Sequence, residues 1–76
     1  MKLNEALKKG RVTFGTKVSL VDSLIKRFNR LDLQEAEVAA FSKTSVAIRT
    51  NQKKTFNLWE HRGDCGWGME DFEVVN

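Results

Sequence analysis

The spacing of the apolar side chains predicts a short helix at the N-terminus. Leu3 and Leu7 lie one helical turn apart within residues 1–10. Asn4 is a candidate N-cap, and Gly10 suits the left-handed residue that often follows a helix. Because an isolated helix shorter than about 12 residues is marginal in water, we expect the apolar side of this one to pack on the rest of the domain.

An alternation of apolar and polar residues replaces the helical spacing in residues 11–21. Its apolar members are Val12, Phe14, Val18 and Leu20. This period of two predicts the first strand. Gly15 interrupts the alternation, so we expect a bulge or a turn at that position.

Residues 22–31 return to a helical spacing, after two good N-cap residues, Asp22 and Ser23. One helical face is apolar and consists of Leu24, Ile25, Phe28 and Leu31. Another face is basic and consists of Lys26, Arg27 and Arg30. The pattern predicts a second, amphipathic helix whose basic face contacts solvent, phosphates or an acidic protein.

Residues 36–75 have the pattern of a strand meander. Three stretches of strand-forming residues are separated by short polar turns, and they read EAEVAAF, SVAIRT and KTFNLWEH. A glycine-containing turn, HRGDCG, and a short last strand, FEVV, follow them. With neither a linker nor an internal repeat, residues 1–76 are expected to form one α+β domain.

The segment GWGMEDFEVV resembles the end of SH3 domains. In that family a Gly-Trp or Gly-aromatic pair precedes a single 3₁₀ turn and a final strand. By this resemblance, Gly66 and Trp67 end the fourth strand, residues 69–72 form the turn and residues 73–75 form the last strand. The resemblance implies an SH3-like small antiparallel barrel of about five strands, with a helix inserted between strands 1 and 2.

Two departures separate the chain from SH3 domains that bind proline-rich peptides. Met69 and Phe72 stand where those domains carry the proline and tyrosine that line the ligand groove. The chain also lacks their acidic, tyrosine-rich first loop and contains no tyrosine. The resemblance therefore implies the barrel without this ligand, since small barrels have many activities. Related barrels of the Tudor, KOW and chromo-like families bind protein tails or nucleic acids on the same strand surface.

The composition is that of a folded domain, with 41% hydrophobic and 30% charged residues. Cys65 is the single cysteine, which excludes an internal disulfide. No apolar run approaches the roughly 20 residues of a membrane span, and the start MKLNEALKKG lacks an apolar signal segment. We expect a cytoplasmic protein that does not enter a membrane.

The residue types needed for catalysis or metal binding are scarce. His61 and Cys65 lie four residues apart across a glycine turn, and no third group is evident to orient the histidine. A structural zinc site takes four ligands, and this pair supplies two. The sequence contains no phosphate-binding glycine loop or paired carboxylates. We therefore expect a protein that is not an enzyme, with no catalytic residue, metal or cofactor.

A protein-binding module is the first functional hypothesis. Trp59 is out of phase with Phe56 and Leu58, so it faces outward if those two residues fill the core. Tryptophan is enriched at binding hot spots. The predicted contact residues are Trp59, Trp67, Arg62, Glu70 and Asp71. Small single-domain chains are frequent among viral or mobile-element regulators of host proteins, so the hypothesis includes that class.

The alternative hypothesis is an RNA- or DNA-binding protein, motivated by the uneven charge. Residues 1–54 carry twelve Lys or Arg and five Asp or Glu, whereas residues 55–76 carry one Arg and five acidic residues. The predicted phosphate contacts lie on the basic helix and the strand surface, at Lys26, Arg27, Arg30, Lys43, Arg49, Lys53 and Lys54. This hypothesis ranks second because acidic residues beside the tryptophans would repel phosphates.

Overall fold

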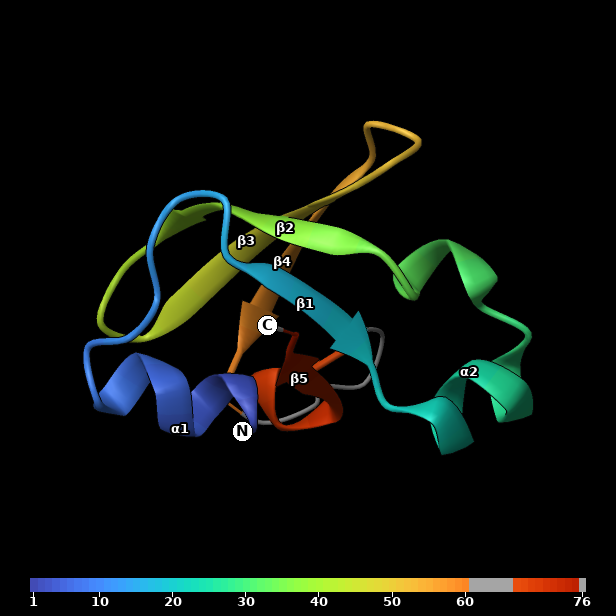
Figure 1. The fold of residues 1–76 in the computed structure, drawn as a ribbon, viewed down its shortest axis with the longest axis horizontal. Helices are drawn as coiled ribbons and strands as arrows, with labels where there is room; N and C mark the ends of the chain where they lie inside the picture. The colour runs from blue at the N-terminus through green and yellow to red at the C-terminus, as the bar shows by residue number, and fades with distance from the viewer. Residues whose placement is uncertain (61–66, 76) are drawn as a thin grey trace.

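The computed structural model describes residues 1–60 and 67–75 of the chain. In chain order the elements are helix α1 (Leu3–Lys8), strand β1 (Lys17–Leu20), helix α2 (Asp22–Phe28), 3₁₀ turn η1 (Leu31–Leu33), strands β2 (Ala36–Phe41), β3 (Ser45–Thr50) and β4 (Thr55–Trp59), 3₁₀ turn η2 (Met69–Asp71) and strand β5 (Phe72–Val74). The strands form one five-stranded antiparallel sheet in the order β4-β3-β2-β1-β5 (Figure 1). The α+β class and the helix between the first two strands are confirmed.

The sheet is open. β4 and β5 are its two edges, and no ladder joins them within the described residues. A single parallel bridge between Trp59 and Gly68 connects the end of β4 to the segment before η2. The α+β sheet is thus established, whereas a closed barrel is not.

The predicted meander of β2, β3 and β4 is confirmed. Val38 lies opposite Ile48, and Val46 lies opposite Leu58. All four of these side chains are buried, and the residues that alternate with them face the other side of the sheet. The register shifts between Val38 and Ala40, which marks a β-bulge in β2.

One hydrophobic core unites the chain, because every helix, 3₁₀ turn and strand contributes at least one buried apolar side chain. The core residues are Leu3, Ala6, Val12, Val18, Leu20, Ile25, Leu33, Ala36, Val38, Val46, Ile48, Leu58, Met69 and Phe72. Phe72, at the start of β5, is the largest of the fully buried side chains. Full burial of such a side chain contributes about 1.5–3 kcal/mol.

Helix α1 confirms the predicted N-terminal helix but not its predicted cap. Lys2, not Asn4, occupies the N-cap position, and it makes no side-chain cap hydrogen bond. Lys2 forms a β-bridge with Glu73, so its backbone is extended and the helix begins at the next residue. Leu3, in the first helical turn, is buried. Gly10 has a φ of 69°, the left-handed backbone expected at this position.

The predicted strand over residues 11–21 is shorter than expected. Only Lys17–Leu20 forms regular strand. Gly15, with a φ of 87°, lies in a turn in which the Thr16 N–H donates to the Thr13 carbonyl at 3.1 Å. The turn ends the alternation and leaves Phe14 with 73% of its surface exposed.

Helix α2 ends three residues earlier than predicted. Asn29 adopts a left-handed conformation, with a φ of 53° and a ψ of 48°, which stops the helix at Phe28. Leu31 belongs instead to η1 and is exposed, so it does not extend the apolar face. The predicted caps are also wrong, because Val21 occupies the N-cap position and no side chain caps the helix.

The end of the chain follows the predicted order of a 3₁₀ turn and a last strand. β5 pairs with β1, and Phe72 lies opposite Leu20. The predicted HRGDCG turn at residues 61–66 lies outside the described residues. Among the described helices, none combines the length and the apolar character that a membrane crossing requires.

Candidate functional site

Trp59 lies on the outer face of the sheet, and its side chain is 58% exposed. Ser45 is directly opposite Trp59, and Ala47 is opposite both Asn57 and Ala40. Cross-strand partners project from the same face, so these side chains share the outer face with the indole. We call this group of five residues the Trp59 face. Helices α1 and α2 both lie below the sheet in the view of Figure 1, α1 at its left and α2 at its right.

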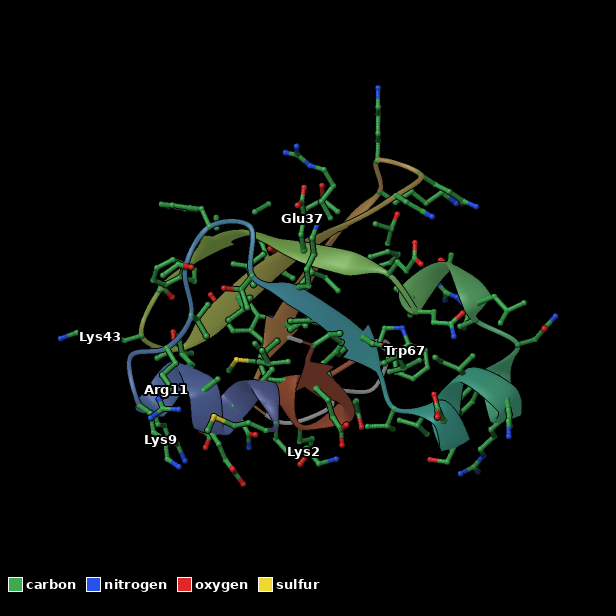
Figure 2. All side chains as sticks on the ribbon, viewed as in Figure 1. Lys2, Lys9, Arg11, Glu37, Lys43 and Trp67 are labelled. Atoms are coloured by element: carbon green, nitrogen blue, oxygen red, sulfur yellow. The ribbon has the colours of Figure 1, made fainter. Side chains whose placement is uncertain are left out.

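A row of charged and polar residues crosses the same outer face farther along the strands. Lys17, Glu37, Arg49 and Thr55 are successive cross-strand partners. The Lys17 Nζ lies 3.2 Å from the Glu37 Oε2. Glu37, labelled in Figure 2, is the cross-strand partner of both Lys17 and Arg49. A depression of about 450 Å³ lies beside this row and extends to Asn51. Its mixed charge suits a polar ligand better than a phosphate backbone.

Trp67 holds α2 against the body of the protein. The Trp67 and Phe28 rings meet edge to face, with centroids 5.4 Å apart and planes at 79°. The Arg27 guanidinium lies 5.3 Å from the centre of the Phe28 ring. Trp67 also packs on the hydrophobic core and is half-buried. The basic helix and Trp67 are therefore in contact, whereas Trp59 faces outward on the sheet.

Asp71, one of the predicted protein-binding residues, is buried, with 7% of its surface exposed. Its Oδ2 accepts a hydrogen bond from the Gly68 N–H at 3.0 Å. The Asp71 N–H donates to the Gly68 carbonyl at 3.0 Å. The carboxylate thus closes the η2 turn, while the neighbouring Glu70 is exposed. Arg62, also predicted to bind protein, lies outside the described residues.

Arg30 is engaged within the domain. Its Nε and Nη2 donate to the two oxygens of Asp32, both at 3.0 Å, and its guanidinium lies 5.7 Å from the centre of the Phe56 ring. These hydrogen bonds, with the nearby positive charge, lower the pKa of the Asp32 carboxyl, and the same pair raises the pKa of Arg30. Arg30 therefore ties the α2–η1 segment to β4.

The other basic residues predicted to bind nucleic acid do not gather on one surface. Lys26 and Arg27 lie on α2. Arg49 lies on β3, near the turn that carries Lys53 and Lys54. Lys43 lies in the turn between β2 and β3, at the far left of Figure 2. These cations are thus distributed over α2, the β3–β4 hairpin and the β2–β3 turn.

Sequence reasoning missed an exposed aromatic pair. Phe14 and Phe41 are 73% and 41% exposed, and their ring centroids are 5.3 Å apart at an angle of 48°. Lys9, Arg11 and Lys43 lie at the same end of the molecule (Figure 2). We call these five residues the basic aromatic end. The available signal was Gly15 itself, because glycine readily adopts the positive φ that the third position of some turns requires.

Comparison of the chain with known protein families, curated proteins and solved structures finds no match. The site is therefore defined by geometry and chemistry alone. Within residues 1–60 and 67–75, no three His, Cys, Asp or Glu side chains gather to hold a metal ion. His61 and Cys65, considered above as a metal or nucleophile pair, lie outside these ranges.

Proposed function

We propose that the protein is a non-enzymatic binding module that docks on another protein through the Trp59 face. The exposure of the Trp59 indole, 58% on a strand surface, is the observation that carries this proposal. An indole buries a large area with few rotatable bonds and offers one hydrogen-bond donor, which is why tryptophan recurs at interface hot spots.

The surroundings of Trp59 favour a docking surface over an accidental exposure. Ser45, Ala47 and Ala40 have short side chains, so they leave the flank of the indole accessible to a partner. Asn57 adds an amide that can donate and accept hydrogen bonds. Because Trp59 is fixed by the β3 ladder and by its bridge to Gly68, docking would immobilise little backbone.

The proposal includes an SH3-like small barrel as the scaffold. The strand order β4-β3-β2-β1-β5 supports it, as does the bridge that links the end of β4 to the segment before β5. Barrels of this kind use their strand surface for binding. The proposal also places the protein among the small single-domain regulators of viruses or mobile elements, which act on a host protein.

A capture experiment in the source cell tests the proposal. Tagged wild type, Trp59→Ala and a control, Lys26→Ala, are used as baits, and each enriched protein is then purified and its affinity measured directly. Trp59→Ala should weaken the affinity by roughly 30-fold or more, as expected for a hot-spot tryptophan. Lys26→Ala, an exposed residue on α2, should not change it.

Circular dichroism and urea unfolding establish that each bait is folded. A direct partner that binds folded Trp59→Ala as tightly as wild type would show that the Trp59 face is not the docking surface. If Trp59→Ala and Lys26→Ala both lost affinity for the partner, the contact would instead involve the charged surface that contains Lys26.

A further inference from the structure

We propose that the basic aromatic end of the molecule binds single-stranded nucleic acid. This function is separate from docking through the Trp59 face and does not depend on it. Of the seven basic residues that the sequence predicts to contact phosphates, only Lys43 belongs to this site. Three observations support it, namely the exposed rings, the hydrogen-bonded turns that carry them and the absence of Asp and Glu from the segments that contain both turns.

The two rings are not part of the hydrophobic core. Neither Phe14 nor Phe41 belongs to the buried cluster or to the partly buried residues packed against it. Their contact with each other leaves 73% of Phe14 and 41% of Phe41 exposed to water. An exposed aromatic pair of this kind is typical of a surface that stacks on a ligand.

Phe14 is presented by a turn with several hydrogen bonds. The Thr13 N–H donates to the Thr16 Oγ1 at 3.0 Å, and the Thr16 N–H donates back to the Thr13 carbonyl at 3.1 Å. Gly15 follows Phe14 with a φ of 87° and donates its N–H to the Val38 carbonyl at 2.9 Å. The turn is thereby joined to β2, which holds Phe14 beside Phe41.

Lys43 and Phe41 belong to a second ordered turn. The Ser42 N–H donates to the Ser45 carbonyl at 2.9 Å. The Ser42 Oγ accepts from the N–H groups of Thr44 and Ser45, both at 3.3 Å. These bonds fix the tip that carries Lys43. The two turns are closed by their own hydrogen bonds, so binding would order little of the protein.

The charge around the rings is complementary to a polyanion. Residues 6–21 and 38–59, which contain both turns, include no Asp or Glu. Among the described residues, Lys9, Arg11 and Lys43 form no ion pair, whereas Lys2, Lys8, Lys17 and Arg30 each pair with a carboxylate. The three cations of the basic aromatic end are thus available to phosphates.

The aromatic rings select single strands over duplexes. Base faces are accessible for stacking when the bases are unpaired, and stacking on aromatic side chains tolerates any sequence. Because the two rings are tilted by 48°, they point at different planes and suit two consecutive bases. An acidic peptide would satisfy the cations but would leave the ring faces without planar partners.

Fluorescence anisotropy with a labelled oligothymidylate of about 12 nucleotides tests the proposal. Wild type should bind at low salt, and Phe14→Ala should weaken binding about tenfold or more, the range measured for stacked bases. Phe14→Trp should retain the affinity and Phe14→Leu should lose it, which separates stacking from apolar contact. Lys43→Ala should lower the slope of log affinity against log salt by about 0.7.

Lys26→Ala, which removes the same charge from α2, is the matched control and should leave affinity and salt slope unchanged. Trp59→Ala should also bind the oligonucleotide as wild type does, so failure of the docking proposal would not affect this result. Absence of binding at low salt, equal binding by Phe14→Ala, or displacement by an equimolar acidic peptide would overturn the proposal. Equal losses for Lys26→Ala and Lys43→Ala would instead indicate diffuse charge attraction, which also overturns it.

Discussion

Asp71 is an ionisable residue whose buried carboxylate organises the turn that leads into β5. Its Oδ2 accepts from the Gly68 N–H at 3.0 Å. Replacing Asp71 by Ala leaves this buried N–H without its acceptor, so we expect a loss of about 1–2 kcal/mol in unfolding free energy. Urea unfolding measures it. Asp71→Asn, which keeps an acceptor oxygen, should lose less, and an equal loss in both variants would contradict the cap.

The Arg30–Asp32 pair predicts a specific pH dependence of stability. Arg30 lowers the pKa of the folded-state Asp32 carboxyl by its hydrogen bonds and charge. A lowered pKa contributes stability above the unfolded-state value of about 3.9, and the contribution disappears as the pH falls through the folded-state pKa. The stability difference between wild type and Asp32→Asn should therefore be constant above about pH 5 and shrink below about pH 4.

The magnitude of this effect is small, because both side chains reach solvent, and we expect about 1 kcal/mol or less. Urea unfolding of the two proteins across this pH range measures it. Glu35→Gln is a control, since Glu35 is exposed and forms no ion pair among the described residues. A difference that grows as the pH falls would contradict the assigned direction.

Single-residue properties were predictable where they follow from strand alternation. Successive side chains of a strand point to opposite faces, so the burial of Leu58 requires Trp59 to face outward. Phe14 broke the same rule because Phe14 and Gly15 form the centre of a turn, which removes the alternation on which the prediction depends. The burial of Asp71 was not predicted, because its bond to Gly68 is local but the burial of the whole turn depends on the packing of Met69 and Phe72 in the core.

Helix α1 is short, and tertiary packing is expected to provide most of its stability. Leu3 is fully buried, and the Met1 carbonyl accepts from the Val74 N–H at 2.9 Å. We therefore expect Leu3→Ala to reduce the unfolding free energy by about 2–4 kcal/mol. Leu31→Ala is the matched control, because Leu31 is 67% exposed and should change stability by less than about 0.5 kcal/mol. Similar losses in thermal or urea unfolding would contradict this packing.

Asn29 determines where α2 ends. Its left-handed backbone, with a φ of 53°, is unfavourable for most residues with a Cβ. Asn29→Ala should cost about 1 kcal/mol, whereas Asn29→Gly should be neutral or stabilising, because glycine adopts this conformation without the steric penalty. Paired urea titrations measure the difference. Equal stability of the two variants would contradict a left-handed residue at this position.

The order of the elements could be predicted because each has a distinct apolar period, but their ends could not. Helix α2 was extended to Leu31 because Leu31 continues the apolar spacing, yet Asn29 interrupts the backbone first. Helix α1 begins at Leu3 because Lys2 is engaged in a bridge with Glu73, a contact between the two ends of the chain. Local spacing carries no information about such a contact.

The opposite charges of the two ends of the sequence meet within the folded molecule. Lys2 lies 3.9 Å from Glu73, and Lys8 lies 3.2 Å from Glu60. α1 thus supplies cations to the acidic segment, and the basic residues of the two turns remain without carboxylate neighbours in their own segments. The acidic residues beside the tryptophans are thereby partly paired with the cations of the N-terminal segment.

The two proposed surfaces lie on opposite faces of the sheet, so they should act independently. Phe41 is opposite Val46, which is buried, whereas Trp59 is opposite Ser45 on the outer face. A partner bound to one face need not obstruct the other. We expect Phe14→Ala to lose oligonucleotide but keep the protein partner, Trp59→Ala to do the reverse, and wild type to form a ternary complex by size-exclusion chromatography. If each variant weakens both ligands, the two surfaces form one site that continues around the end of the sheet.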